Sequence, residues 1–99
     1  MSDLKTIKDL PGAQQKMLDV ILSFRRPSFR TSDVVEKTKT DDMNGRSVGA
    51  ILGSLHKNGY LVKVQGGRDK LWRLSDEVEN SKDGIRTQLT EVKQYWSHI

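Results

Sequence analysis

The chain has 99 residues and a net charge of +4, from 17 lysines and arginines against 13 aspartates and glutamates. This length allows a single hydrophobic core and leaves no room for a separate ligand-binding domain. The absence of cysteine excludes disulfides and thiolate metal sites, while short apolar runs and a charged start exclude a membrane span and a signal peptide, so we expect a cytoplasmic protein.

Residues 1–10 are expected to form an N-terminal extension. A first helix follows, with Pro11 at its first position, where a proline loses no needed hydrogen bond. Its apolar residues recur at helical spacing, and Arg25, Arg26 and Pro27 end it. This stripe consists of Met17, Leu18, Ile21, Leu22 and Phe24.

The segment 28–31 is short enough to form a single strand, and a second helix follows it. Thr31 or Ser32 can cap this helix, because a side-chain hydroxyl can accept a hydrogen bond from an exposed backbone amide. Val34 and Val35 are its expected core residues.

A third helix is expected after a turn at residues 40–43, with Asp42 or Asn44 as its cap. Four apolar residues fall within one arc at 100° per residue, and small and basic residues occupy the opposite side. The arc holds Val48, Ile51, Leu52 and Leu55, and the outward side holds Arg46, Ala50, Gly53 and Lys57. Gly59 ends the helix, because glycine takes the left-handed conformation without a steric clash. One side therefore faces the core, and the other is free to contact a partner.

A two-stranded hairpin follows the third helix. Residues 60–65 are rich in β-branched and aromatic side chains, Gly66 and Gly67 can form a turn, and residues 70–74 return as the second strand. The segment 44–75 holds six cations and one anion, so it carries +5 while the remainder of the chain carries −1. These cations can simply form a charged surface that keeps the hairpin hydrated. Their clustering, however, favours a partner with a phosphate backbone.

Three features of this region occur in order: Leu-x-x-x-Gly-Tyr-Leu at residues 55–61, the glycine-tipped basic hairpin, and Trp-Arg-Leu-Ser at residues 72–75. With them, the segment 11–75 resembles the winged-helix branch of the helix-turn-helix superfamily, including small MarR- and PadR-like transcriptional regulators. The resemblance implies an α+β winged helix-turn-helix fold, a three-helix bundle with a β-hairpin wing. It also implies that the strand at 28–31 pairs beside the wing and that the third helix enters the major groove of DNA.

The resemblance and the charge pattern together predict double-stranded DNA as the partner. Arg46 is best suited to a bidentate contact with guanine, and Asn44 and Ser47 are the other candidates for contacts with base edges. Ala50 and Gly53 lie on the same outward side. The other cations are expected to contact phosphate, which positions a protein without specifying a sequence; they are Lys57, Lys63, Arg68, Lys70 and Arg73.

Gly45, Gly49 and Gly53 recur every four residues along the third helix. An internal glycine costs about 1 kcal/mol relative to alanine, so these positions need an explanation. Gly49 lies at the border of the buried arc, which favours close packing against the second helix or the wing. Gly53 faces outward, which favours the close approach of a partner.

The sequence gives little support for enzymatic chemistry. His56 and His98 are far apart in the chain, and we interpret His56 as a hydrogen-bonded structural residue. Asp41 and Asp42 precede a helix, where carboxylates usually complement the helix dipole instead of binding a metal. We therefore expect no enzyme, no cofactor, no metal site and no small-molecule ligand.

Residues 76–99 are predicted to form a helix from about Glu79 to His98, with Gly84 as a weak point. Their apolar residues follow the a/d pattern of a heptad repeat; these are Val78, Ile85, Leu89, Val92, Trp96 and Ile99. Such a stripe has to be covered, because a helix gains most of its stability from packing. We expect a dimer interface formed by Ile85, Leu89, Val92 and Trp96. The alternative is that the helix folds back on its own domain and completes a monomer.

The resulting hypothesis is sequence-selective binding of double-stranded DNA by a small dimeric transcriptional regulator or repressor, which would be nucleoid-associated if the protein is prokaryotic. A dimer would present two recognition helices to two half-sites about one helical turn apart. Two alternatives stay open. One is a protein-interaction module that receives a partner helix on the outward side of the third helix, and the other is a nucleoid-architectural protein with nearly equal affinity for all duplexes.

Overall fold

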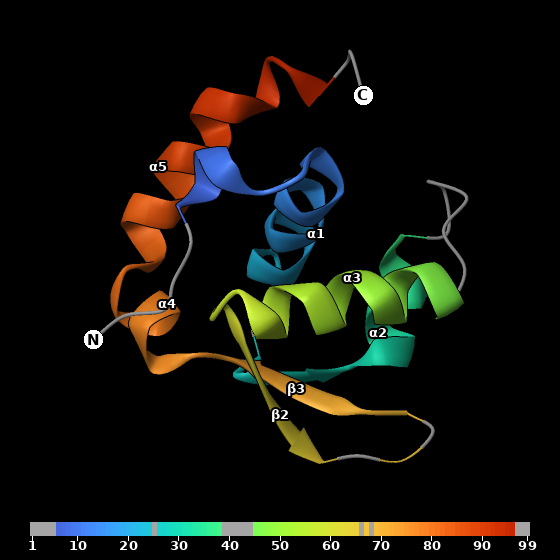
Figure 1. Cartoon of the computed structure of the whole chain (residues 1–99). Helices are drawn as coiled ribbons and strands as arrows, with labels where there is room; N and C mark the ends of the chain where they lie inside the picture. The colour runs from blue at the N-terminus through green and yellow to red at the C-terminus, as the bar shows by residue number, and fades with distance from the viewer. Residues whose placement is uncertain (1–5, 25, 39–44, 66, 68, 97–99) are drawn as a thin grey trace.

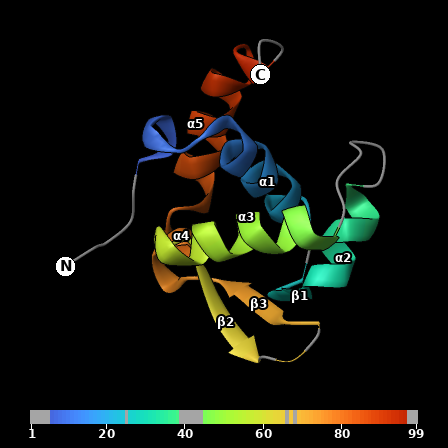
Figure 2. The same ribbon diagram turned by 45° about the vertical axis from the view of Figure 1, so that its right-hand side comes forward.

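The computed structural model describes residues 6–24, 26–38, 45–65, 67 and 69–96, and Figure 1 shows their arrangement. Helix α3 lies between α1 on one side and a small sheet on the other, and α5 runs beside α1 (Figures 1 and 2). The elements in chain order are η1 (Ile7–Asp9), α1 (Gly12–Leu22), β1 (Ser28–Arg30), α2 (Thr31–Lys37), α3 (Gly45–Lys57), β2 (Leu61–Gln65), β3 (Leu71–Leu74), α4 (Asp76–Asn80) and α5 (Lys82–Lys93).

The sheet has three antiparallel strands in the order β1-β3-β2. The predicted single strand at 28–31 is confirmed as Ser28–Arg30, and it pairs with β3 so that Phe29 lies opposite Trp72. On the other side of β3, Leu61 lies opposite Leu74. All four of these side chains are buried, so this face of the sheet packs on the helices.

Helix α3 buries the predicted arc. Val48, Leu52 and Leu55 have no exposed surface, and Ile51 is partly buried against the same core. The helix ends in a hydrogen-bond pattern known as the Schellman motif. The amide of Gly59, with φ of 90°, donates to the carbonyl of His56 at 3.1 Å, and the amide of Tyr60 donates to that of Leu55 at 3.0 Å. The predicted glycine stop is therefore confirmed.

The ends of α1 and the start of α2 differ from those predicted. Pro11 precedes α1 with an extended ψ of 150°, and α1 ends at Leu22, before the predicted stop at residues 25–27. Neither Thr31 nor Ser32 caps α2; Arg30 precedes the helix, and its amide donates to the Asp33 carboxylate at 2.8 Å. The two hydroxyl groups instead bond to the wing region, as described below. The predicted turn at 40–43 and the caps Asp42 and Asn44 lie outside the described residues.

The C-terminal segment forms two helices, not the single helix expected from about Glu79. Helix α4 ends at Asn80, and Ser81, with φ of −118°, separates it from α5. Helix α5 packs against η1 and α1. Ile85, Leu89 and Val92 are 4%, 1% and 7% exposed, so they belong to the core.

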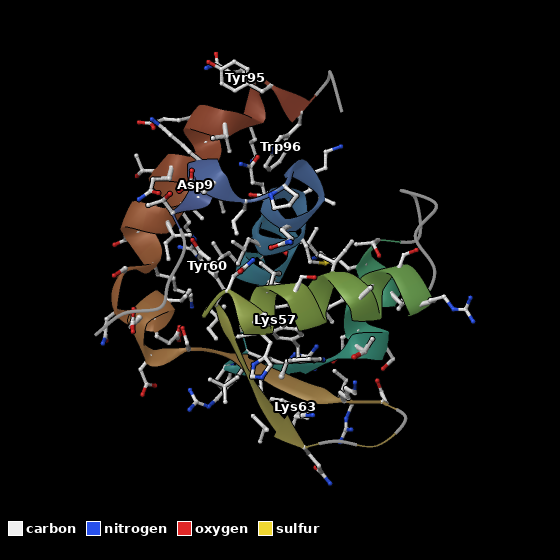
Figure 3. The ribbon with its side chains drawn as sticks, in the orientation of Figure 1. Asp9, Lys57, Tyr60, Lys63, Tyr95 and Trp96 are labelled. Atoms are coloured by element: carbon white, nitrogen blue, oxygen red, sulfur yellow. The ribbon has the colours of Figure 1, made fainter. Side chains whose placement is uncertain are left out.

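The end of the described chain is tied to its start by two hydrogen bonds through one glutamine. The indole nitrogen of Trp96 donates to Gln15 Oε1 at 3.0 Å, and Gln15 Nε2 donates to the carbonyl of Ile7 at 2.8 Å. Arg86 also donates to the carbonyl of Leu22 at 3.2 Å. In Figure 3 Trp96 lies toward α1, whereas the neighbouring Tyr95 lies at the outer edge.

These contacts correct the interpretation of the C-terminal stripe. The residues expected at a dimer interface, Ile85, Leu89, Val92 and Trp96, pack on η1 and α1 of their own chain. The opposite side of α5 is polar, with Asp83, Thr87, Thr90 and Gln94. The fold-back alternative therefore matches the burial, because the stripe needs no second subunit to cover it. A homodimer stays a prediction.

One continuous core unites the three predicted segments. Ile7 and Leu10 of the expected N-terminal extension, and Val78 of the C-terminal segment, belong to the same buried cluster as the winged-helix residues. The boundaries predicted at residues 10 and 75 therefore divide one packed unit. None of the described helices is long and apolar enough to cross a lipid bilayer.

Candidate nucleic-acid interface

The outward side of α3 has a cation near each end and little side chain between them. Arg46 and Lys57 are exposed, as is Ala50 between them, so the predicted orientation of the helix is confirmed. The two cations are eleven positions apart in the sequence, which corresponds to about 16 Å along a helix. Ser47 is also exposed and makes a contact within the chain. Asn44 lies outside the described residues.

The glycines of α3 are not explained by packing. A methyl group added at Gly45, Gly49 or Gly53 would meet no atom of a neighbouring element within 4 Å. The prediction that Gly49 packs closely on the second helix or the wing is therefore wrong, because the space beside it is open. The helix backbone is accessible from outside along this side.

The wing adds two exposed cations, Lys63 on β2 and Lys70 just before β3. Lys63 lies opposite Trp72 in the register, so both side chains project from the face of the sheet that carries α3. Lys57 and Lys63 lie on neighbouring elements, the end of α3 and β2 (Figure 3). A bulge between Lys63 and Gln65 interrupts the ladder, and Val64 within it is 51% exposed.

Arg73 does not join the other cations. Side chains alternate along a strand, so Arg73 projects from the face opposite to that of Trp72. Its Nη1 lies 3.3 Å from Asp76 Oδ1 and donates to the carbonyl of Leu74 at 3.0 Å. The expected phosphate contact of Arg73 is therefore not supported by its position, since a neighbouring carboxylate partly neutralises its charge. Arg68 lies outside the described residues.

The other four cations are not neutralised in this way. In the part of the chain that the structure describes, no carboxylate lies within 4.0 Å of Arg46, Lys57, Lys63 or Lys70. The described ion pairs join other residues, such as Lys93 with Asp19 on α1. Among the described residues, the charges of these four side chains are therefore not offset by ion pairs, which favours a positive potential over α3 and the wing.

Asp69 is the single anion of this basic segment, and sequence reasoning assigned it no role. Its Oδ1 accepts from the amide of Ser32 at 2.9 Å, and its Oδ2 accepts from the Ser32 hydroxyl at 2.8 Å. These two bonds, with a smaller effect of the nearby Arg30 charge, hold the pKa of the Asp69 carboxyl below its usual value. Asp69 therefore caps α2 across 37 residues of sequence, a relation that no local pattern reveals.

The predicted structural role of His56 is confirmed. Its Nδ1 donates to the carbonyl of Leu61 at 2.8 Å, and its ring packs edge-on against Trp72 with 5.9 Å between centroids. The indole nitrogen of Trp72 donates to Thr31 Oγ1 at 3.0 Å. These bonds join α3, the wing and the start of α2. Among the described residues, no group of three or more histidines and carboxylates could hold a metal ion.

Comparisons with known proteins bear on the fold. No protein-family model matches the chain, and no curated protein matches it. A solved structure, the DNA-binding domain of the repressor BlaI, superimposes with a TM-score of 0.56 and 24% sequence identity. The alignment covers 72% of this chain and 85% of that domain. Together with the helix order and the β1-β3-β2 sheet, this similarity shows that the chain has the winged helix-turn-helix fold predicted from its sequence.

Proposed function

We propose that the protein binds double-stranded DNA as a transcriptional regulator, through the outward side of α3 and the wing. One observation carries this proposal: Arg46, Lys57, Lys63 and Lys70 are exposed on adjoining elements, and none of the described carboxylates lies within 4.0 Å of them. The similarity to the DNA-binding domain of a repressor supports it. Cations grouped in this way displace counterions from DNA, and this release drives association at low salt.

The arrangement also indicates how DNA would be read. Arg46 is the long side chain best placed for a base edge, while the lysines suit phosphate oxygens. The middle of α3 presents Gly49, Ala50 and Gly53, which carry no hydrogen-bonding side chain. Affinity would therefore come mainly from the backbone contacts, with modest sequence selectivity. A regulator of this kind would repress by occluding the polymerase.

The proposal is tested by measuring the affinity for a fixed duplex and for random duplexes between 50 and 200 mM salt. Three phosphate contacts, from Lys57, Lys63 and Lys70, correspond to a loss of affinity of roughly fortyfold over this range. The double variant Lys57→Ala/Lys63→Ala should reduce the salt slope by about two contacts. Lys82→Ala is the matched control, because Lys82 lies on α5, 3.4 Å from Glu79, and should bind as the unaltered protein does.

The same experiment separates the alternatives. An absence of binding even at 50 mM salt would overturn the DNA assignment in favour of a protein-interaction module on the open side of α3. Equal affinity for all duplexes would favour an architectural role over regulation. A homodimer remains part of the proposal, because two weakly selective domains on paired half-sites gain affinity through effective concentration. Its interface would have to lie outside the buried stripe of α5.

A further inference from the structure

An anion in the middle of a surface that binds DNA should weaken binding, yet Asp69 occupies such a position in the wing. The geometry points to a compensating role: we propose that Asp69 is a positioning residue that fixes the loop side of the wing, at residues 69–70, to the start of α2. This inference rests on the proposed function, because the wing that it holds is part of the proposed DNA surface.

The Asp69 side chain is fully engaged at the start of α2. Both carboxylate oxygens accept hydrogen bonds from Ser32, at 2.9 Å from the amide and 2.8 Å from the hydroxyl. The amide of Ser32 is one of the first amides of the helix, which have no partner within the helix. A carboxylate is well suited to this place, because it also interacts favourably with the positive end of the helix dipole.

Further hydrogen bonds surround this contact. The amide of Thr31 donates to the carbonyl of Lys70 at 3.1 Å, and the guanidinium of Arg30 donates to the carbonyl of Asp69 at 3.2 Å. Thr31 also accepts from the indole of Trp72. Beyond the β1–β3 ladder, the segment 30–32 is thus joined to the segment 69–72 by backbone and side-chain bonds. We call this set of contacts the wing latch.

Two physical effects of Asp69 on DNA binding oppose each other. Its charge repels phosphate, so a purely electrostatic role predicts that any neutral replacement tightens binding. The latch reduces the freedom of the wing before binding, so its loss adds an ordering cost to association. The positioning effect should dominate, because the charge already faces two close donors and the helix dipole instead of solvent alone.

The test compares Asp69→Ala with Asp69→Asn, two variants that remove the same charge. Asparagine keeps an oxygen that can accept from Ser32, whereas alanine keeps none. We expect Asp69→Ala to weaken duplex binding by about five- to tenfold. This is the effect of losing roughly one hydrogen bond, which adds to the cost of ordering the wing on DNA. Asp69→Asn should bind at least as tightly as the unaltered protein. Equal affinity of the two variants, or tighter binding by Asp69→Ala, would overturn the inference.

Ser32→Ala provides a second variant that changes no charge. It should weaken binding in the same direction as Asp69→Ala, and the double variant Ser32→Ala/Asp69→Ala should be no weaker than Asp69→Ala alone. Additive losses in this cycle would mean that the two residues act separately, against a shared latch. If Asp69→Ala fails to fold, Ser32→Ala alone keeps the inference testable, and unchanged binding by Ser32→Ala would then overturn it.

A readout without DNA completes the experiment. The indole N–H resonance of Trp72 reports its bond to Thr31 beside the latch. It should shift or broaden in Asp69→Ala and stay near its original position in Asp69→Asn, while the indole resonance of Trp96 serves as the internal reference. An unchanged Trp72 resonance in Asp69→Ala would count against the latch.

If the unaltered protein binds no DNA at 50 mM salt, the proposed function fails and this inference fails with it. Equal affinities of Asp69→Ala and Asp69→Asn, in contrast, overturn the inference alone.

Discussion

Arg46 and Lys63 should affect DNA binding in different ways, although each contributes one positive charge. Arg46 stands near the start of α3, where a guanidinium can reach a guanine edge, and Lys63 lies on the wing. Arg46→Ala should reduce the preference for one base pair by about 1–3 kcal/mol, whereas Lys63→Ala should weaken binding to all sequences. Competition binding on a panel of single-base variants measures both effects. Unchanged selectivity in Arg46→Ala would contradict the placement of α3 in the groove.

Tyr60 makes the stability of the fold sensitive to alkaline pH. Burial, with a smaller effect of the Asp9 charge, raises the pKa of the Tyr60 phenol from 10.0 to about 12. The folded state thus holds this proton more tightly than the unfolded state. The resulting stability is complete below pH 10 and is lost as the pH rises toward 12. Figure 3 shows Tyr60 and Asp9 in the region between η1 and the end of α3.

The measurement is the free energy of unfolding in urea at pH 8 and pH 11. It should fall more steeply with pH in the unaltered protein than in Tyr60→Phe, which lacks the titrating phenol. Because the chain has two tyrosines, absorbance in Tyr95→Phe follows the ionisation of Tyr60 alone. A midpoint near 10 in that titration would contradict the effect of burial.

At the scale of elements, α3 carries a conflict between stability and the proposed binding. Replacing Gly49 or Gly53 with alanine should stabilise the helix by up to about 1 kcal/mol, because the new methyl group meets no neighbouring element. The same methyl group would stand on the side proposed to approach DNA. We therefore expect Gly53→Ala to raise the melting temperature and to lower the affinity for duplex DNA.

The matched control is Gly84→Ala on α5, which is also free of neighbours within 4 Å and lies outside the proposed surface. It should increase stability without changing DNA binding. If Gly53→Ala binds DNA as well as the unaltered protein does, the backbone of α3 does not approach the groove closely at this point.

At the scale of the whole molecule, the C-terminal helix is part of the folding unit. Leu89 is 1% exposed and lies in the core shared by η1, α1 and α5. Leu89→Ala should lower the free energy of unfolding by about 2–5 kcal/mol, because it leaves a cavity in that core. Urea denaturation measures this loss, and light scattering should show an unchanged mass.

Thr87→Ala is the control on the outward side of α5, where a substitution should change stability by less than about 0.5 kcal/mol. If Leu89→Ala instead stays folded and has half the light-scattering mass of the unaltered protein, that result would support the dimer interface predicted from the sequence pattern.

Features that depend on residues close together in the chain were predictable from the sequence, and features that depend on residues far apart in the chain were not. The orientation of α3 and its glycine stop were predictable, because Val48, Leu52 and Gly59 act within a few residues of one another. The same applies to the short strand predicted at 28–31, which the structure places at Ser28–Arg30, and to the hydrogen-bonded role of His56. The cap of α2 was not predictable, because its acceptor, Asp69, lies 37 residues away.

The sequence by itself indicated the winged helix-turn-helix fold through the family resemblance of residues 11–75. It also determined the side of α3 that faces outward, because helical periodicity is a local property. Only the tertiary structure decided what covers the stripe of Ile85, Leu89 and Val92, since a periodic apolar face specifies that it must be buried but not against which surface. It also decided which cations lie near a carboxylate: Arg73 lies 3.3 Å from Asp76, whereas no described carboxylate lies within 4.0 Å of Lys63. The charge of a side chain is given by the sequence, but the direction in which it points depends on the folded backbone.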